Sequence, residues 1–130
     1  MVIEEIAIDT SVLIPYFQND LEIIDRLDAI KNICVPIFVI GEMMIGFFMT
    51  KTSETAKDNF EFFLSKTRIL ECTRDVANKY GELVATLREK GSMIPANDIW
   101  IAACCLVHNK YLATKDEHFL KVPQLAVEIW

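Results

Sequence analysis

Short apolar runs alternate along the chain with longer stretches in which apolar residues recur every three or four positions. The short runs are predicted to be buried strands, at Glu5–Asp9, Ile33–Val35, Arg68–Cys72, Tyr111–Thr114 and Ala126–Trp130. Strands that alternate with helices favour an α/β fold with a central parallel sheet, here of about five strands, and helices on both of its faces. No repeat or linker interrupts the pattern, so we expect one domain over residues 1–130.

The longer stretches are predicted to be helices, and several are preceded by polar residues that commonly cap helices. The expected caps are Thr10 or Ser11, Asp20, Ser53, Thr73 and Asn97. Pro36 is expected as the first residue of an apolar helix that extends to Thr50, because proline suits that position. Gly91 is expected to end another helix. The helix that starts at Asp98 is apolar all round from Ile99 to Val107, which predicts that it is fully buried.

The composition argues against disorder and against a membrane span. Of the 130 residues, 52% are hydrophobic, which is ample material for a core. The longest apolar stretch, Ile33–Met49, contains Pro36 and Glu42 and is shorter than the roughly 20 residues that cross a bilayer. The first seven residues contain two glutamates and no basic segment, so we expect no signal peptide and a cytoplasmic protein.

The four cysteines favour neither a zinc site nor a disulfide framework, because no two of them have the C-x-x-C spacing. They are predicted to be reduced, buried thiols: Cys34, Cys72, Cys104 and Cys105.

Four acidic residues occupy positions where an active site is expected. Asp9 ends the first predicted strand and Asp116 follows the fourth, and parallel sheets bind ligands beyond the carboxyl ends of their strands. Asp98 opens the buried helix, and Glu42 is the only charged residue from Pro36 to Met49. Taken singly, each aspartate could be a helix cap or turn former, and Glu42 could lie on a solvent-facing stripe.

The net charge of -6 argues against a nucleic-acid-binding protein, which usually carries a basic patch. Without the four acids named above, however, 13 basic residues would face 15 acidic ones. Much of the acidity could therefore belong to one site that a cation would neutralise.

The acids stand in the segments IDTSVLI (8–14), EMMIG (42–46), NDIWIAA (97–103) and LATKDEHF (112–119), which are followed by PQLAVEIW (123–130). Taken together, these segments resemble the PIN-domain ribonucleases, and among them the VapC toxins of toxin–antitoxin pairs. The resemblance covers the whole chain, and its most specific part is the ND-x-x-IAA block together with T-x-D.

This resemblance implies a metal-dependent endoribonuclease, with Mg²⁺ or Mn²⁺ as cofactor. It assigns catalysis to Asp9, Glu42, Asp98 and Asp116, with Thr10, Ser11 and Thr114 in supporting roles. Asp9, Asp98 and Asp116 are expected to bind the metal, because Mg²⁺ prefers oxygen ligands. A bound cation would polarise the phosphate and lower the pKa of water. The implied partners are an RNA substrate, a cognate antitoxin and a second copy of the chain.

The prediction of a homodimer also rests on the helix from Pro36 to Thr50, whose apolar residues are too many to face one core. Other residues near the acids are given secondary roles. His118 could touch a substrate but is not expected to be catalytic, and Trp100 and the Phe47–Phe48 pair are expected to be packing residues. Three lysines are candidates for contacts with phosphate: Lys110, Lys115 and Lys121.

Two other functions compete with a nuclease. One is a non-catalytic module of the same fold that acts through a protein partner. The other is a phosphoacceptor receiver domain, which also combines a five-stranded parallel sheet with acids and Mg²⁺. A receiver has an acidic pair after its first strand, where Thr10 and Ser11 follow Asp9, and an aspartate after its third strand, where Cys72 and Thr73 stand.

Overall fold

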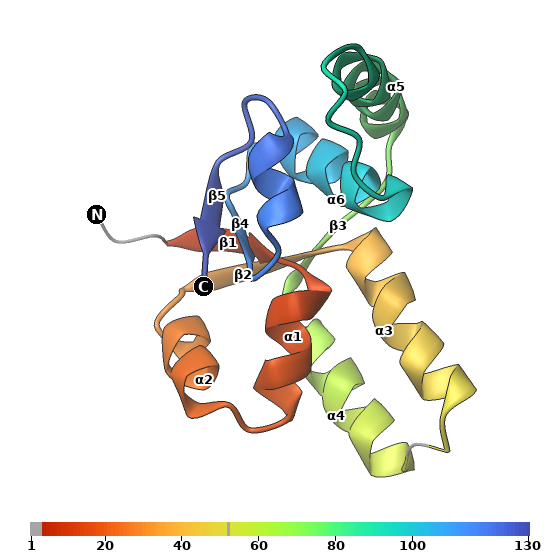
Figure 1. The fold of residues 1–130 in the computed structure, drawn as a ribbon. Helices are drawn as coiled ribbons and strands as arrows, with labels where there is room; N and C mark the ends of the chain where they lie inside the picture. The colour runs from red at the N-terminus through yellow and green to blue at the C-terminus, as the bar shows by residue number, and fades with distance from the viewer. Residues whose placement is uncertain (1–3, 52) are drawn as a thin grey trace.

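In the computed structural model, which describes residues 4–51 and 53–130, one sheet of five parallel strands forms the centre of the molecule (Figure 1). The strands are β1 (Glu5–Ile8), β2 (Asn32–Pro36), β3 (Arg68–Leu70), β4 (Leu112–Thr114) and β5 (Val127–Ile129). They lie in the order β3-β2-β1-β4-β5, and each neighbouring pair is parallel. The predicted α/β fold is thus confirmed. Residues 1–3 and 52 of the predicted domain lie outside the described part.

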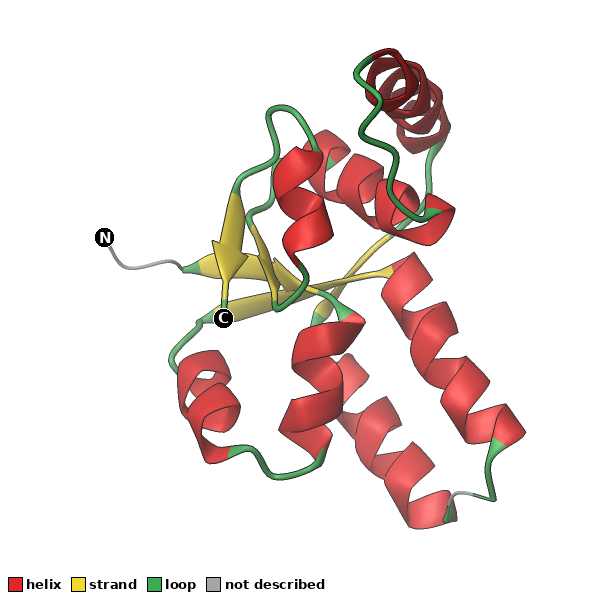
Figure 2. Ribbon diagram, in the orientation of Figure 1, coloured by secondary structure: helices red, strands yellow, loops and turns green. Residues whose placement is uncertain are grey.

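Helices cover both faces of this sheet. They are α1 (Thr10–Phe17), α2 (Leu21–Asp28), α3 (Ile37–Met49), α4 (Glu54–Ser65), α5 (Arg74–Glu89) and α6 (Ala96–Val107), with a short 3₁₀ helix, η1 (Glu117–Lys121). In Figure 2, α1, α2 and α4 lie on one side of the strands, and α5 and α6 lie on the other. None of the described helices is long and apolar enough to cross a membrane.

Three of the predicted helix caps are present. The side chains of Asp20, Ser53 and Thr73 each accept a hydrogen bond from the backbone N–H three residues later, at 3.3, 3.2 and 3.3 Å. Each of these bonds satisfies one of the N–H groups that a helix leaves free in its first turn. Gly91 follows the end of α5 with a positive φ of 64°, as its predicted place requires.

The other predicted helix starts were wrong. Asp9, rather than Thr10 or Ser11, precedes α1. Pro36 ends β2 with an extended ψ of 140°, so α3 begins one residue later. In the same way Pro95 has an extended ψ of 142° and α6 begins at Ala96, which places Asn97 inside the helix. Proline fixes φ near a value that helices and extended chains share, so the sequence alone did not determine ψ.

Several strand boundaries also differ from the prediction. β3 ends at Leu70, before Cys72, and the half-exposed Tyr111 lies outside β4. β5 is shorter at both ends than predicted. The 3₁₀ helix η1 was not predicted, because a single turn of five residues is too short to show a helical period.

The core contains the whole middle of α6, where every residue from Ile99 to Cys105 except Trp100 is buried. Trp100 stacks with Tyr80 at 3.8 Å and with Phe38 at 5.2 Å between ring centroids, so its predicted packing role is confirmed. Phe47 packs on Phe60, but Phe48 is 77% exposed, which contradicts the prediction for that ring.

All four cysteines are free, as predicted. Three of them are buried, but Cys72 is exposed in the loop between β3 and α5. That loop is also where a receiver domain would hold its phosphoacceptor. The strand order excludes a receiver as well, because the receiver sheet has the order 2-1-3-4-5.

Candidate active site

The four predicted acids come from four separate segments, which meet at the carboxyl ends of the central strands. Asp9 follows β1 and Asp116 follows β4, and these strands are parallel neighbours in the centre of the sheet. After β1 the chain adds β2 and β3 on one side of this strand, and then adds β4 and β5 on its other side. The strand order therefore reverses between β1 and β4. Ligands of such sheets bind at this reversal of strand order. Asp98 comes from the first turn of α6, and Glu42 from the middle of α3.

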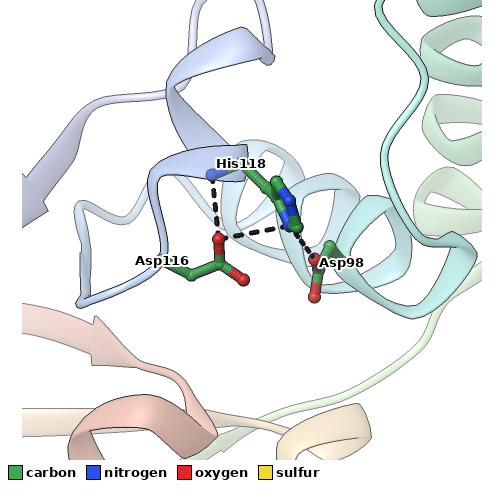
Figure 3. A group of neighbouring side chains, drawn as sticks. All are labelled: Asp98, Asp116 and His118. Carbon is green, nitrogen blue, oxygen red and sulfur yellow. Dashed lines mark hydrogen bonds and ion pairs between the residues drawn. The ribbon is translucent and has the colours of Figure 1, made fainter.

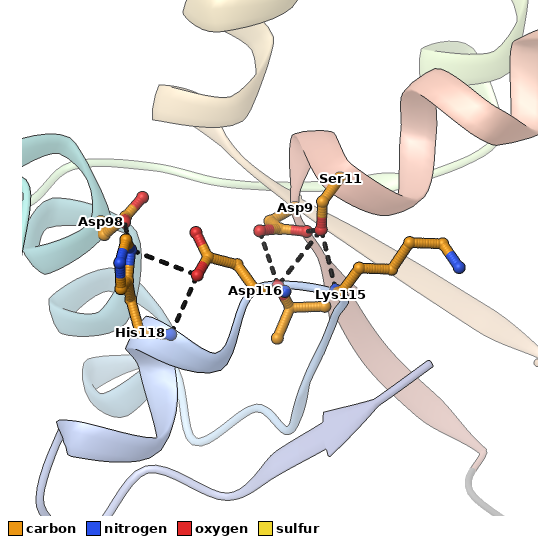
Figure 4. A network of polar contacts seen from close by, with 7 residues as sticks. Asp9, Ser11, Asp98, Lys115, Asp116 and His118 are labelled. Carbon is orange, nitrogen blue, oxygen red and sulfur yellow. Dashed lines mark hydrogen bonds and ion pairs between the residues drawn. The ribbon is translucent and has the colours of Figure 1, made fainter.

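The carboxylate of Asp9 accepts hydrogen bonds from two hydroxyl groups, one in the first turn of α1 and one at the end of β4 (Figure 4). Ser11 Oγ donates to Asp9 Oδ1 at 2.6 Å, and Thr114 Oγ1 donates to Asp9 Oδ2 at 2.8 Å. The same hydroxyls accept backbone N–H groups of the turn after β4, from Lys115 at 2.8 Å and from Asp116 at 2.9 Å. This hydroxyl clasp fixes the carboxylate of Asp9 relative to the turn that carries Asp116.

The second part of the site is a close group of Asp98, Asp116 and His118 (Figure 3). His118 Nδ1 lies 3.2 Å from Asp116 Oδ1 and 3.5 Å from Asp98 Oδ2. The ligand atoms of the three residues all lie within 4.8 Å of one another. Asp9 and Glu42 are not members of this tight group, although both interact electrostatically with Asp98.

Burial and mutual repulsion raise the pKa of three of the acids. For Asp9, burial is the larger cause, the charges of Asp98 and Asp116 add to it, and the two hydroxyl donors oppose it. For Glu42, burial again raises the pKa, the charges of Asp98 and Asp9 add to it, and the neighbouring polar side chains of Thr10 and Asn97 oppose it. For Asp98, burial and the charge of Asp116 raise the pKa, and His118 opposes them. Negative charge concentrated in this way favours the binding of a cation.

The simple structural roles considered for these acids fit only one of them. Asp9 precedes α1, but its side chain makes no capping hydrogen bond to the helix. Asp98 is inside α6, whose N-cap residue is Pro95. Asp116 does cap η1, through a 2.9 Å hydrogen bond from the His118 N–H. Glu42 is half-buried rather than on a solvent-facing stripe.

The supporting residues have distinct partners. Ser11 and Thr114 form the hydroxyl clasp, whereas Thr10 lies near Glu42 and its buried Oγ1 has no hydrogen-bond partner among the described residues. Thr10 and Glu42 also line an open pocket of about 330 Å³ whose other walls, from α1 and α3, are mostly apolar. A larger pocket of about 640 Å³, between α1, α2 and α4, contains none of the four acids.

The structure contradicts the prediction for one of the basic residues, Lys110. Lys110 is not at the site, because its Nζ pairs with Glu5 Oε2 at 2.8 Å at the opposite edge of the sheet. The Nζ of Lys115 lies 3.5 Å from the carbonyl oxygen of Trp130. His118 contacts two of the acids, a position that the D-x-H spacing after β4 could have indicated.

Comparison with known proteins places this geometry in a family. The chain matches the PIN domain family over residues 6–125. It therefore belongs to the PIN domain family, as the resemblance of its motifs predicted. Among curated relatives, Ribonuclease VapC2 of Rickettsia felis is 29% identical over 115 residues, which cover 88% of this chain and 84% of the relative.

Solved structures agree on the fold. The structure of VapBC2 from Rickettsia felis bound to a promoter DNA fragment superposes with a TM-score of 0.90 at 24% identity, covering 97% of this chain and 98% of the other. DNA-bound VapBC from Salmonella typhimurium gives a TM-score of 0.88 at 21% identity, covering 98% of each chain.

The donor atoms at the site fit a divalent cation. Carboxylate oxygens are the ligands that Mg²⁺ and Mn²⁺ prefer, and here they come from separate elements, which leaves room for water and a substrate oxygen. The raised pKa values of Asp9, Glu42 and Asp98 indicate that the site lacks compensating positive charge. A cation held by Asp9, Asp98 and Asp116 would supply it.

Proposed function

We propose that this protein is a metal-dependent endoribonuclease and the toxin of a VapBC-type toxin–antitoxin pair. The observation that carries the proposal is the convergence of Asp9, Glu42, Asp98 and Asp116 at the central reversal of the sheet. The relatives named Ribonuclease VapC support RNA as the substrate. An RNA substrate and four free thiols both suit a cytoplasmic protein.

The proposed reaction is hydrolysis of a phosphodiester bond. A bound Mg²⁺ or Mn²⁺ would supply positive charge that polarises the phosphate and favours ionisation of the attacking water. Asp9, Asp98 and Asp116 would hold this ion, and Ser11 and Thr114 keep the Asp9 carboxylate in place. Burial raises the pKa of Glu42, which makes its carboxylate a better acceptor for a proton that the attacking water loses.

The partners follow from the same site and from the surface of α3. VapBC complexes among the structural relatives support a cognate antitoxin as partner. An antitoxin arginine placed among the four carboxylates would satisfy several of them and displace the cation. We also propose a homodimer, because the end of α3 exposes large apolar side chains.

The proposal is tested with purified protein and a set of single-stranded and structured RNAs, in Mg²⁺, in Mn²⁺ and in EDTA. We expect cleavage with metal, none in EDTA, and a loss of about 100-fold or more in Asp98→Asn. Asp75→Asn is the matched control, because Asp75 is an exposed aspartate in the first turn of α5. Equal cleavage by wild type and Asp98→Asn would contradict the proposal. A metal-bound protein that cleaves no RNA would favour the non-catalytic module instead.

A further inference from the structure

His118 lies where a third ligand would be expected for a metal ion that Asp98 and Asp116 bind. Its imidazole reaches both carboxylates through one atom, Nδ1, and both contacts are visible in Figure 3. A histidine that only capped or packed would need one such contact at most. The side chain is 48% exposed, so burial does not force the ring into this position.

The distances within this group are slightly longer than the spacing of ligands around one ion. In an octahedral site with metal–ligand bonds of about 2.1 Å, adjacent ligand atoms are about 3.0 Å apart and opposite ones about 4.2 Å. The two Nδ1–oxygen distances are 3.2 and 3.5 Å, slightly more than the adjacent spacing. All three ligand atoms lie within 4.8 Å of one another. A small contraction would therefore complete three positions of such an octahedron.

The other two acids lie outside these three positions. Asp9 is held beside the group by the hydroxyl clasp, and each of its carboxylate oxygens keeps a second lone pair for an ion. Glu42 is on α3, outside the tight group. Nδ1 of His118 is thus the one side-chain nitrogen that the structure places against a carboxylate oxygen of Asp98 and of Asp116 together, among the described residues.

We propose that Nδ1 of His118 is a ligand of the divalent cation bound by Asp98 and Asp116, and that it makes the site prefer Mn²⁺ to Mg²⁺. The inference rests on the metal dependence of the proposed function. Imidazole nitrogen binds first-row transition metals better than it binds Mg²⁺, which favours purely oxygen ligands. The histidine therefore changes which ion the site selects as well as how tightly it binds.

The direct test is pulsed electron paramagnetic resonance of the wild-type protein loaded with Mn²⁺. A nitrogen hyperfine coupling is expected, and it should disappear in His118→Ala. The matched control is His108→Ala, which changes the other histidine of the chain; that ring contacts the backbone oxygen of Glu71 at 3.0 Å. His108→Ala should keep the coupling.

Calorimetric titration with Mn²⁺ and with Mg²⁺ gives the second readout. His118→Ala should bind Mn²⁺ about tenfold more weakly and Mg²⁺ within about twofold of wild type. Bound Mn²⁺ without nitrogen coupling, or an equal loss for both ions, would overturn the proposal for His118 while leaving a metal-dependent nuclease intact. A wild-type protein that bound neither ion would overturn both.

Discussion

Asp98 illustrates how the position of one carboxylate determines its effect on stability. It is largely buried, it lies close to Asp116, and both conditions raise the pKa of its carboxyl group. The ionised form is therefore less stable in the folded protein than in the unfolded chain. A residue selected only for stability would not be expected to keep a charge there.

The first prediction concerns Asp98→Asn without metal. We expect this variant to melt no lower than wild type in EDTA, with a gain in stability on the order of 1 kcal/mol, because it removes one of the repelling charges. Mg²⁺ should raise the melting temperature of wild type and raise that of the variant much less, since the ion binds only the folded site. Thermal melts with EDTA and with Mg²⁺ measure both effects.

Asp75→Asn is the control in the same melts, and its expected effects on stability and on the Mg²⁺ response are the opposite of those of Asp98→Asn. It should lose up to about 1 kcal/mol, because it removes a favourable charge from the start of α5, and it should keep the full Mg²⁺ response. If the two variants responded equally to Mg²⁺, Asp98 would not belong to the metal site.

The same cluster predicts an unusual dependence of stability on pH. Because the folded pKa values of Asp9, Glu42 and Asp98 are raised, the folded protein binds more protons than the unfolded chain between the ordinary and the raised values. In EDTA, stability should therefore rise as the pH falls from neutral through the raised values. At lower pH the trend should reverse, because the pKa of Glu5 is lowered, chiefly by Lys110, and its protonation costs stability.

Urea denaturation at a series of pH values, in EDTA and in saturating Mg²⁺, measures this dependence. Mg²⁺ should remove the rise, because the ion keeps the carboxylates ionised in the folded state. Stability in EDTA that increased steadily from mildly acidic to neutral pH would show that the three acids do not repel one another as inferred.

At the scale of elements, the order of strands and helices could be predicted from the sequence, whereas several of their ends could not. Apolar periodicity identified all five strands and the helices around them, because burial on a sheet or helix face leaves a regular spacing. The first residues of α3 and α6 depend on the ψ angles of Pro36 and Pro95, which the residue type does not determine. The acids could be named from their places after strands, but the contact of His118 with Asp98 joins two segments that only the fold brings together.

Two glycines, one just after α5 and one inside it, should respond in opposite ways to replacement by alanine. Gly91 has a positive φ of 64°, which costs a residue with a side chain about 1 kcal/mol or more, so Gly91→Ala should destabilise the protein. Gly81 lies within the same helix, is exposed, and has open space where a Cβ would be. Gly81→Ala should stabilise by about 0.5–1 kcal/mol. Urea midpoints compare the two, and shifts of the same sign would contradict the argument.

At the scale of the whole molecule, α3 connects the site to a surface that one chain does not cover. Glu42 faces the other acids, while the C-terminal part of the same helix exposes three large apolar side chains. Ile45, Phe48 and Met49 are 57%, 77% and 81% exposed. The apolar surplus that the sequence predicted for this helix is therefore present at the surface.

We predict that this end of α3 is buried between two copies of the chain. Light scattering at micromolar concentration should give twice the chain mass of 14.9 kDa, and Phe48→Glu should give the mass of one chain. Leu21→Glu is the control, since Leu21 is 73% exposed on α2 and should leave the dimer intact. A monomeric wild type would contradict the prediction and leave this surface for another partner.

The division of the four acids along the chain has a consequence for fragment complementation. Asp9 and Glu42 precede the loop at residues 91–95, and Asp98 and Asp116 follow it. The hydroxyl clasp spans the same division, because Ser11 precedes the loop and Thr114 follows it. A chain opened at this loop would give two pieces, each with half of the carboxylates. Cleavage of RNA would then report the reassembly of the two pieces, and neither would be active when expressed alone.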